Sequence, residues 1–252
     1  MDRSLLGILI VLVASTIAGA QSPCKTTWSE AIKAQGGMDA LLNVKNEVIV
    51  AHPTGGRSGR VETVYDFPNR WWMRDDARPS VLGVTVRMED FAKKVTYVSH
   101  NDTSDSPLSP MDRARLDQTV DASGTAVWLP TATYLLLTKW AQPTIVGCRR
   151  AKYEGKSVDV VAATSGGTLL DFYFDTKTHI NVRIASKSAD GTLRDAVDLR
   201  GHKIVGGITV PTKVKYSDGS QETLSFHFNV RINQVAFEKT VLLGADVWTD
   251  AP

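Results

Sequence analysis

The sequence predicts a mainly β protein with helices, of the α+β class, built on a long curved antiparallel sheet. Two observations predict this fold. Apolar and polar residues alternate with a period of two over much of the chain after residue 42, which is typical of strands that bury one face. The chain has no β-α-β rhythm, and half-buried strands favour an antiparallel meander over a parallel sheet. An N-terminal helix and a central helical insertion are expected to cover the concave face.

Residues 1–20 have the pattern of a cleavable secretory signal peptide. A short polar start is followed by the apolar run Leu5 to Val13 and then by the small residues Ala18-Gly19-Ala20. The apolar run has the length of a signal peptide core and is too short to span a bilayer. We therefore expect cleavage before Gln21, a periplasmic location, and a single domain over residues 21–252.

The composition of the chain excludes some classes of partner. The net charge is +2 and no basic run is present, so nucleic acid is not an expected partner. No second apolar stretch reaches the length of a membrane span, so the mature chain is expected to have no transmembrane segment.

Two helices are expected before the first strand. The first covers Trp28 to Gln35, with Thr27 as the N-cap, Glu30 three residues later, and Gly36-Gly37 as the stop signal. A second, shorter helix is expected from Met38 to Leu42. After it the strands begin.

The clearest strands form two predicted hairpins. Residues 170–174 and 180–184 alternate around a turn at 175–178, and residues 208–216 and 224–233 alternate around a turn at Asp218-Gly219. An earlier strand covers residues 61–67. The residues expected to share the buried face are Val61, Thr63, Tyr65, Phe67, Leu170, Phe172, Phe174, Ile180, Val182, Ile184, Ile208, Val210, Val214, Tyr216, Leu224, Phe226, Phe228, Val230 and Ile232, whereas residues such as Asn181 and His227 are expected on the polar face.

The region between residues 101 and 140 interrupts the strands. Ser, Asp and Pro are frequent at its start, and two helical stretches are expected after them, at Met111 to Val120 and Trp128 to Trp140. The second places Trp128, Leu135 and Leu136 on one apolar face. This helix is the candidate lid of the sheet.

The two cysteines, Cys24 and Cys148, are the only ones in the chain. In an oxidising compartment the simplest outcome is one disulfide that ties the mature N-terminus to the middle of the chain. Two free thiols are the alternative. Neither cysteine has a second cysteine or a histidine at metal-ligand spacing.

The sequence contains no motif that indicates catalysis. Its five histidines are more than twenty residues apart along the chain, so no local metal motif is present, and we expect no metal and no cofactor. The chain also lacks a nucleophile elbow, a Walker A loop and a dinucleotide fingerprint. We therefore expect a protein that is not an enzyme, with a hydrolase assembled from dispersed residues as the less favoured alternative.

Large apolar side chains gather in the segment from Phe67 to Arg74. Trp71 and Trp72 are adjacent on a predicted strand, so their side chains point to opposite faces and at least one of them should enter the concave face. Two interpretations remain open here: ordinary core packing, or one side of an apolar pocket that the helix from Trp128 to Trp140 closes.

The order of these parts resembles the periplasmic outer-membrane lipoprotein carrier and sorting proteins. The resemblance rests on Gly36 to Lys45, on Pro68-Asn69-Arg70-Trp71-Trp72-Met73-Arg74, and on the closing strands from Gly207 to Lys213 and from Phe226 to Asn233, before Phe237. The residue before Pro68-Asn69 is Phe67 here, whereas the best-known carrier has an arginine there that helps to hold its lid shut.

The resemblance implies an unclosed β-barrel whose hydrophobic concavity holds acyl chains beneath a helical lid. The implied function is that of a periplasmic carrier for a lipid or an acylated lipoprotein, and an envelope protein-interaction module is the alternative. The residues expected to line the ligand site are Phe67, Trp71, Trp72, Trp128, Leu135, Leu136, Phe172, Phe174, Phe226 and Phe228.

Overall fold

The computed structural model describes residues 23–55, 58–67, 70–76, 84–90, 95–100, 106–107, 144–165, 168–188, 190–237 and 247–249. Thirteen strands form one large sheet, in the order β6-β5-β4-β3-β2-β1-β15-β14-β11-β10-β9-β8-β7. These strands are β1 (Asn46–Pro53), β2 (Val61–Asp66), β3 (Arg70–Asp75), β4 (Thr85–Asp90), β5 (Val95–His100), β6 (Ser106–Pro107), β7 (Thr144–Tyr153), β8 (Lys156–Ser165), β9 (Thr168–Asp175), β10 (Asn181–Lys187), β11 (Leu193–Arg200), β14 (Lys213–Tyr216) and β15 (Gln221–Phe228).

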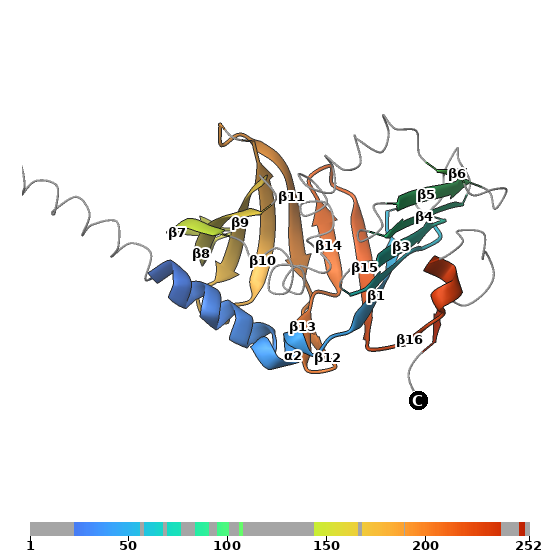
Figure 1. Cartoon of the computed structure of the whole chain (residues 1–252). Helices are drawn as coiled ribbons and strands as arrows, with labels where there is room; N and C mark the ends of the chain where they lie inside the picture. The colour runs from blue at the N-terminus through green and yellow to red at the C-terminus, as the bar shows by residue number, and fades with distance from the viewer. Residues whose placement is uncertain are drawn as a thin grey trace, which may run out of the picture.

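Every neighbouring pair in this sheet is antiparallel, as the alternating pattern predicts. Within the described residues β6 and β7 are the two edges and do not pair with each other, so the sheet is not closed. Two smaller pairs flank it, β12 (Lys203–Val205) with β13 (Ile208–Val210), and β16 (Arg231–Ile232) with β17 (Trp248–Thr249). The mainly β architecture is therefore confirmed (Figure 1).

The N-terminal helix covers residues 23–35 and begins earlier than predicted. Pro23 is the first of the described residues and is already helical. The prediction that Thr27 is the N-cap is wrong, because its hydroxyl Oγ1 lies inside the helix and donates to the Pro23 carbonyl oxygen at 3.1 Å. The short second helix, α2 (Met38–Leu42), has the predicted bounds.

Gly36 lets the chain turn between the two helices and pass close to the β12–β13 hairpin. Its φ is +133°, and a Cβ built on it would lie 2.4 Å from the Gly207 carbonyl oxygen. The Thr209 hydroxyl donates to the Ala34 carbonyl oxygen at 3.0 Å, which holds the end of the first helix against the same hairpin. In Figure 1 this helix runs beside the β7 to β10 end of the sheet toward β12 and β13.

The two faces of the sheet carry separate hydrophobic clusters. On β1, Ile49 and Ala51 belong to the larger cluster and Val48 and Val50 to the smaller one, as expected for strands whose side chains alternate. We call the face with the larger cluster the inner face and the other the outer face. The central strands β1 to β3 are thus buried on both faces.

The outer face of β1 to β4 is covered by the last part of the chain. Val230, Ala236, Phe237 and Val247 pack there against an outer-face group formed by Val48, Val50, Val64, Trp72, Val86 and Met88. The 3₁₀ helix η2 (Gln234–Phe237) lies against β3 and β4, as Figure 1 shows. The Arg70 guanidinium lies 4.8 Å from the centre of the Phe237 ring. This contact holds the covering segment at the start of β3.

The predicted alternation fails at the end of β15. Asn229 has a φ of +55°, a left-handed conformation that asparagine tolerates better than most residues. Its amide N–H donates to the Asn46 carbonyl oxygen at 3.1 Å, and the chain then crosses to the outer face. Val230 and Ile232 were predicted on the same face as Phe228, but they belong to the outer-face cluster.

The alternation also shifts within the β9–β10 hairpin. The hairpin is confirmed, but its register changes between Asn181 and Arg183, so Val182 is the extra residue of a bulge. Asn181 lies opposite Phe174 and is only 4% exposed. The prediction that Asn181 lies on the polar face is therefore wrong.

Candidate ligand-binding face

The structure places most of the described candidate residues on the inner face. Trp71, Phe172, Phe174 and Phe226 are buried in its cluster, and Phe67 and Phe228 pack against that cluster while remaining partly exposed. Trp72 lies on the outer face, packed in the second cluster. The predicted lid residues Trp128, Leu135 and Leu136 lie outside the described residues.

The N-terminal helix covers the inner face at the β8–β9 end of the sheet. The Trp28 ring meets the rings of Phe172 and Phe174 edge-on, with centroids 5.2 Å and 5.9 Å apart. Both phenylalanines are fully buried, as is Leu170 beside them. The described contacts of Phe172 and Phe174 are those of core residues beneath a helix.

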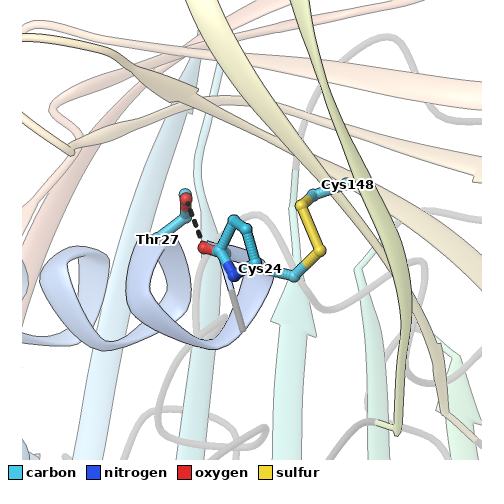
Figure 2. The surroundings of a disulfide bond; sticks show 4 residues. Cys24, Thr27 and Cys148 are labelled. Atoms are coloured by element: carbon cyan, nitrogen blue, oxygen red, sulfur yellow. Dashed lines mark hydrogen bonds between the residues drawn. A yellow bond between two sulfur atoms is a disulfide. The ribbon is translucent and has the colours of Figure 1, made fainter. Parts of the chain in front are cut away.

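A disulfide fastens this helix to the edge strand β7. Cys24 of the helix is bonded to Cys148, with their Cα atoms 5.4 Å apart and a sequence separation of 124. Figure 2 shows the bond between the helix and the strand. The pairing predicted from the cysteine count is confirmed, and no free cysteine is found in the described part of the chain.

The opposite part of the inner face carries aromatic side chains from the β2 and β3 region and from β15, which lie on the two sides of β1. We call it the aromatic surface and define it by Tyr65, Phe67, Trp71, Phe226 and Phe228. The Tyr65 and Phe67 rings stack with centroids 6.0 Å apart, and the Phe226 and Phe228 rings with centroids 6.3 Å apart. The half-buried rings of Phe67 and Phe228 are the accessible parts of this surface.

Glu47 lies between the two aromatic pairs and was not singled out by the sequence. On β1 it is directly opposite Tyr65 of β2 on one side and Phe228 of β15 on the other. Its side chain is 1% exposed, and its Oε2 atom has no hydrogen-bond partner among the described residues. Burial raises the pKa of this carboxyl well above its usual value, because an apolar environment penalises the charged form.

We expect Glu47→Gln to flatten the pH dependence of stability. Because the pKa is higher in the folded chain than in the unfolded chain, the folded state binds more protons between the two values. The contribution of Glu47 is fully present below the unfolded pKa of about 4.5 and is lost as the pH rises toward the folded pKa. From this one group, the free energy of unfolding changes by at most about 1.4 kcal/mol per pH unit.

Urea denaturation of both proteins from about pH 4 to about pH 8 measures this slope. Identical slopes for wild type and Glu47→Gln would show that the carboxyl is not held neutral in the folded state. A glutamine keeps the shape of the side chain, so a loss of slope without loss of the fold isolates the ionisation.

The outer face of the β7–β11 half is polar. Asp171 is 1% exposed and accepts from Arg149 at 2.8 Å and from Lys187 at 2.7 Å. Nearby, the Arg183 guanidinium donates to Asp198 at 2.9 Å and lies 5.0 Å from the centre of the Tyr153 ring. Ion pairs thus link described side chains of neighbouring strands on this face.

A pocket of about 340 Å³ opens at the end of this half of the sheet. Its lining includes the charged side chains of Glu154, Lys156, Asp175 and Arg200. His202 also lines it, and burial lowers the pKa of this histidine, an effect that a backbone hydrogen bond at Asn181 opposes. Such a mixed, charged lining is poorly suited to an acyl chain.

The described residues show no metal-binding cluster and no membrane-spanning helix. No group of three or more His, Cys, Asp or Glu side chains in this part of the chain is placed to hold a metal ion. None of its helices combines the length and the apolar character that a membrane span requires.

His227 was expected on the polar face of its strand. It is half-buried, because the ring of Trp248 lies 4.5 Å from the His227 ring, centroid to centroid.

Solved structures share the fold at low sequence identity. A DUF1329 family protein from Desulfovibrio piger is 13% identical, with a TM-score of 0.54, and the match covers 88% of this chain and 99% of that chain. This likeness shows that the two chains share a fold. No family model matches the chain, and no curated protein matches its sequence.

Two weaker likenesses concern proteins whose descriptions name the family that the sequence resembles. A LolA superfamily protein from Nitrosomonas europaea is 12% identical, with a TM-score of 0.47, over 78% of this chain and 90% of that chain. An outer membrane lipoprotein-sorting protein domain from Vibrio parahaemolyticus is 10% identical, with a TM-score of 0.48, over 84% and 94%.

Proposed function

We propose that this protein is a periplasmic carrier that holds the acyl chains of a lipid or of an acylated lipoprotein against the aromatic surface of its inner face. In this proposal residues 1–20 direct export and are removed, and the protein performs no catalysis. The observation that supports the proposal most directly is the aromatic surface on an unclosed sheet, with Phe67 and Phe228 partly exposed.

The physical argument is the transfer of apolar groups out of water. Each methylene group removed from water contributes about 0.8 kcal/mol, so a long acyl chain is bound without many polar contacts. The rings of Tyr65 and Phe67 at the end of β2, and those of Phe226 and Phe228 on β15, lie on one face on the two sides of β1. The β8–β9 end of the same face is covered by the N-terminal helix, which leaves the β1, β2, β3 and β15 region as the proposed site.

The test compares two half-buried positions on opposite faces. Phe228 lies on the inner face beside Phe226, and Ile232 packs on the outer-face cluster. We expect Phe228→Gln to weaken binding of the fluorescent apolar probe N-phenylnaphthylamine by roughly tenfold, because about 1 to 2 kcal/mol of apolar contact is lost. Ile232→Gln should leave probe binding within about twofold of wild type.

Both variants are first compared by circular dichroism and urea denaturation, so that a change in binding is read only on folded protein. Equal binding by wild type and Phe228→Gln would exclude the aromatic surface as the site. Loss of binding in Ile232→Gln alone would move the site to the outer face.

A further inference from the structure

Glu47 is unusual among the buried acidic residues of the described chain. Three carboxylates are buried there, Glu47, Glu62 and Asp171. Glu62 is paired with Arg60 at 3.1 Å and accepts from the Trp248 indole N–H. Asp171 is paired with two cations. Only Glu47 has a buried carboxyl oxygen without a partner in this part of the molecule.

The neighbours of Glu47 place its carboxyl in the aromatic surface. Its partners across the strands are Tyr65 and Phe228, and Trp71 follows beyond Tyr65 on β3. Another acidic side chain on this face, Glu222 of β15, accepts from the Tyr216 hydroxyl at 2.8 Å. Glu222 thus has a hydrogen-bonding partner, whereas the described strands offer none to Glu47 Oε2.

A buried polar group without a partner destabilises a fold, and an apolar side chain of similar shape would not. The described residues do not supply such a partner for Glu47 Oε2, so a bound ligand is a candidate partner. Burial favours the neutral carboxylic acid, which has one O–H donor as well as acceptor oxygens. The complementary ligand group is therefore an uncharged acceptor, and a carbonyl oxygen fits an acyl ligand.

We propose that the Glu47 carboxyl donates a hydrogen bond to the carbonyl oxygen of an acyl ester or amide bound on the aromatic surface. This proposal rests on the proposed carrier function and assigns it a ligand class: chains linked through an ester or amide, as opposed to bare hydrocarbons. The aromatic rings contact the chain, and Glu47 fixes the position of its carbonyl end. Glu47 is then a specificity-determining residue.

The test uses two ligands with the same number of carbon atoms, methyl laurate and tridecane. Each displaces N-phenylnaphthylamine from wild type, Glu47→Leu and Glu47→Gln. Wild type should bind the ester about fivefold to tenfold more tightly than the hydrocarbon, the range of one buried neutral hydrogen bond. Glu47→Leu should remove this preference without weakening the binding of tridecane. Glu47→Gln, whose amide is still a donor, should keep most of the preference for the ester.

Glu62→Gln is the matched control, since Glu62 is a buried acid on the outer face of the neighbouring strand. It should keep the preference for the ester. An unchanged preference in Glu47→Leu would overturn the assignment of Glu47, and so would tighter binding of dodecylamine than of methyl laurate, which would indicate a charged carboxylate. Failure of wild type to bind the probe and both ligands would instead overturn the carrier function itself.

Discussion

Replacing Cys24 and Cys148 by serine is expected to lower the free energy of unfolding of the mature protein by about 4 kcal/mol. The disulfide closes a loop with 124 residues of sequence separation, and in the chain-entropy model a loop of this size removes much of the freedom of the unfolded chain. The bond also holds the helix that places Trp28 over Phe172 and Phe174.

Urea denaturation of the oxidised protein and the double variant measures this difference. Each single serine variant should lose about as much as the double variant, because either substitution removes the same bond. A loss below about 1 kcal/mol would mean that the helix stays in place without its covalent link and that the unfolded chain is already restricted by other means.

Phe172→Ala is expected to cost about 3 to 5 kcal/mol of stability. The ring is fully buried at the β8–β9 end of the inner face, between the Phe174 ring at 6.4 Å and the Trp28 ring at 5.2 Å. Its removal leaves a cavity that the helix cannot fill while Cys24 holds it to β7. Trp28→Ala should share part of this cost, because the two rings are in contact.

Thermal and urea denaturation compare this variant with Leu193→Ala on the same half of the sheet. Leu193 is 52% exposed, so its truncation should change stability by no more than about 0.5 kcal/mol. Equal small effects at both positions would contradict the view that the helix-covered end of the inner face is a packed core.

Much of the fold was predictable because its strands follow simple alternation. The β14–β15 hairpin, the β9–β10 hairpin, the short helix α2 and the Cys24–Cys148 bond all agree with the sequence. In each case a local pattern or a simple count contains the information. The predicted helical insertion, including Trp128 to Trp140, lies outside the described residues and stays a prediction.

The errors arise where one residue changes the conformation of the backbone. Alternation assumes that every residue of a strand is extended. Asn229 has a left-handed backbone conformation, and Val230 after it therefore lies on the outer face. The bulge at Val182 likewise turns Asn181 inward. At the N-terminal helix, Thr27 and Glu30 have the pattern of a capping box, but residues 23–26 are already helical, so this local pattern does not mark the start of the helix.

The candidate site was only partly predictable. Alternation at Trp71 and Trp72 indicates that the two rings face opposite ways, but the identity of the inner ring depends on the long-range cover of the outer face by Phe237 and Val247. The signal for Glu47 in the sequence is a single acid directly before the apolar run from Val48 to Ala51. A strand buried on both faces has no solvent side on which to place such a charge.

The most direct test of the carrier function is mass spectrometry of organic extracts from the purified mature protein, with Phe228→Gln and Ile232→Gln treated in parallel. The proposed function predicts acyl lipid in stoichiometric amount with wild type and with Ile232→Gln, and much less with folded Phe228→Gln. Absence of lipid from wild type, together with failure to take up added acyl lipid, would contradict the function proposed for the inner face.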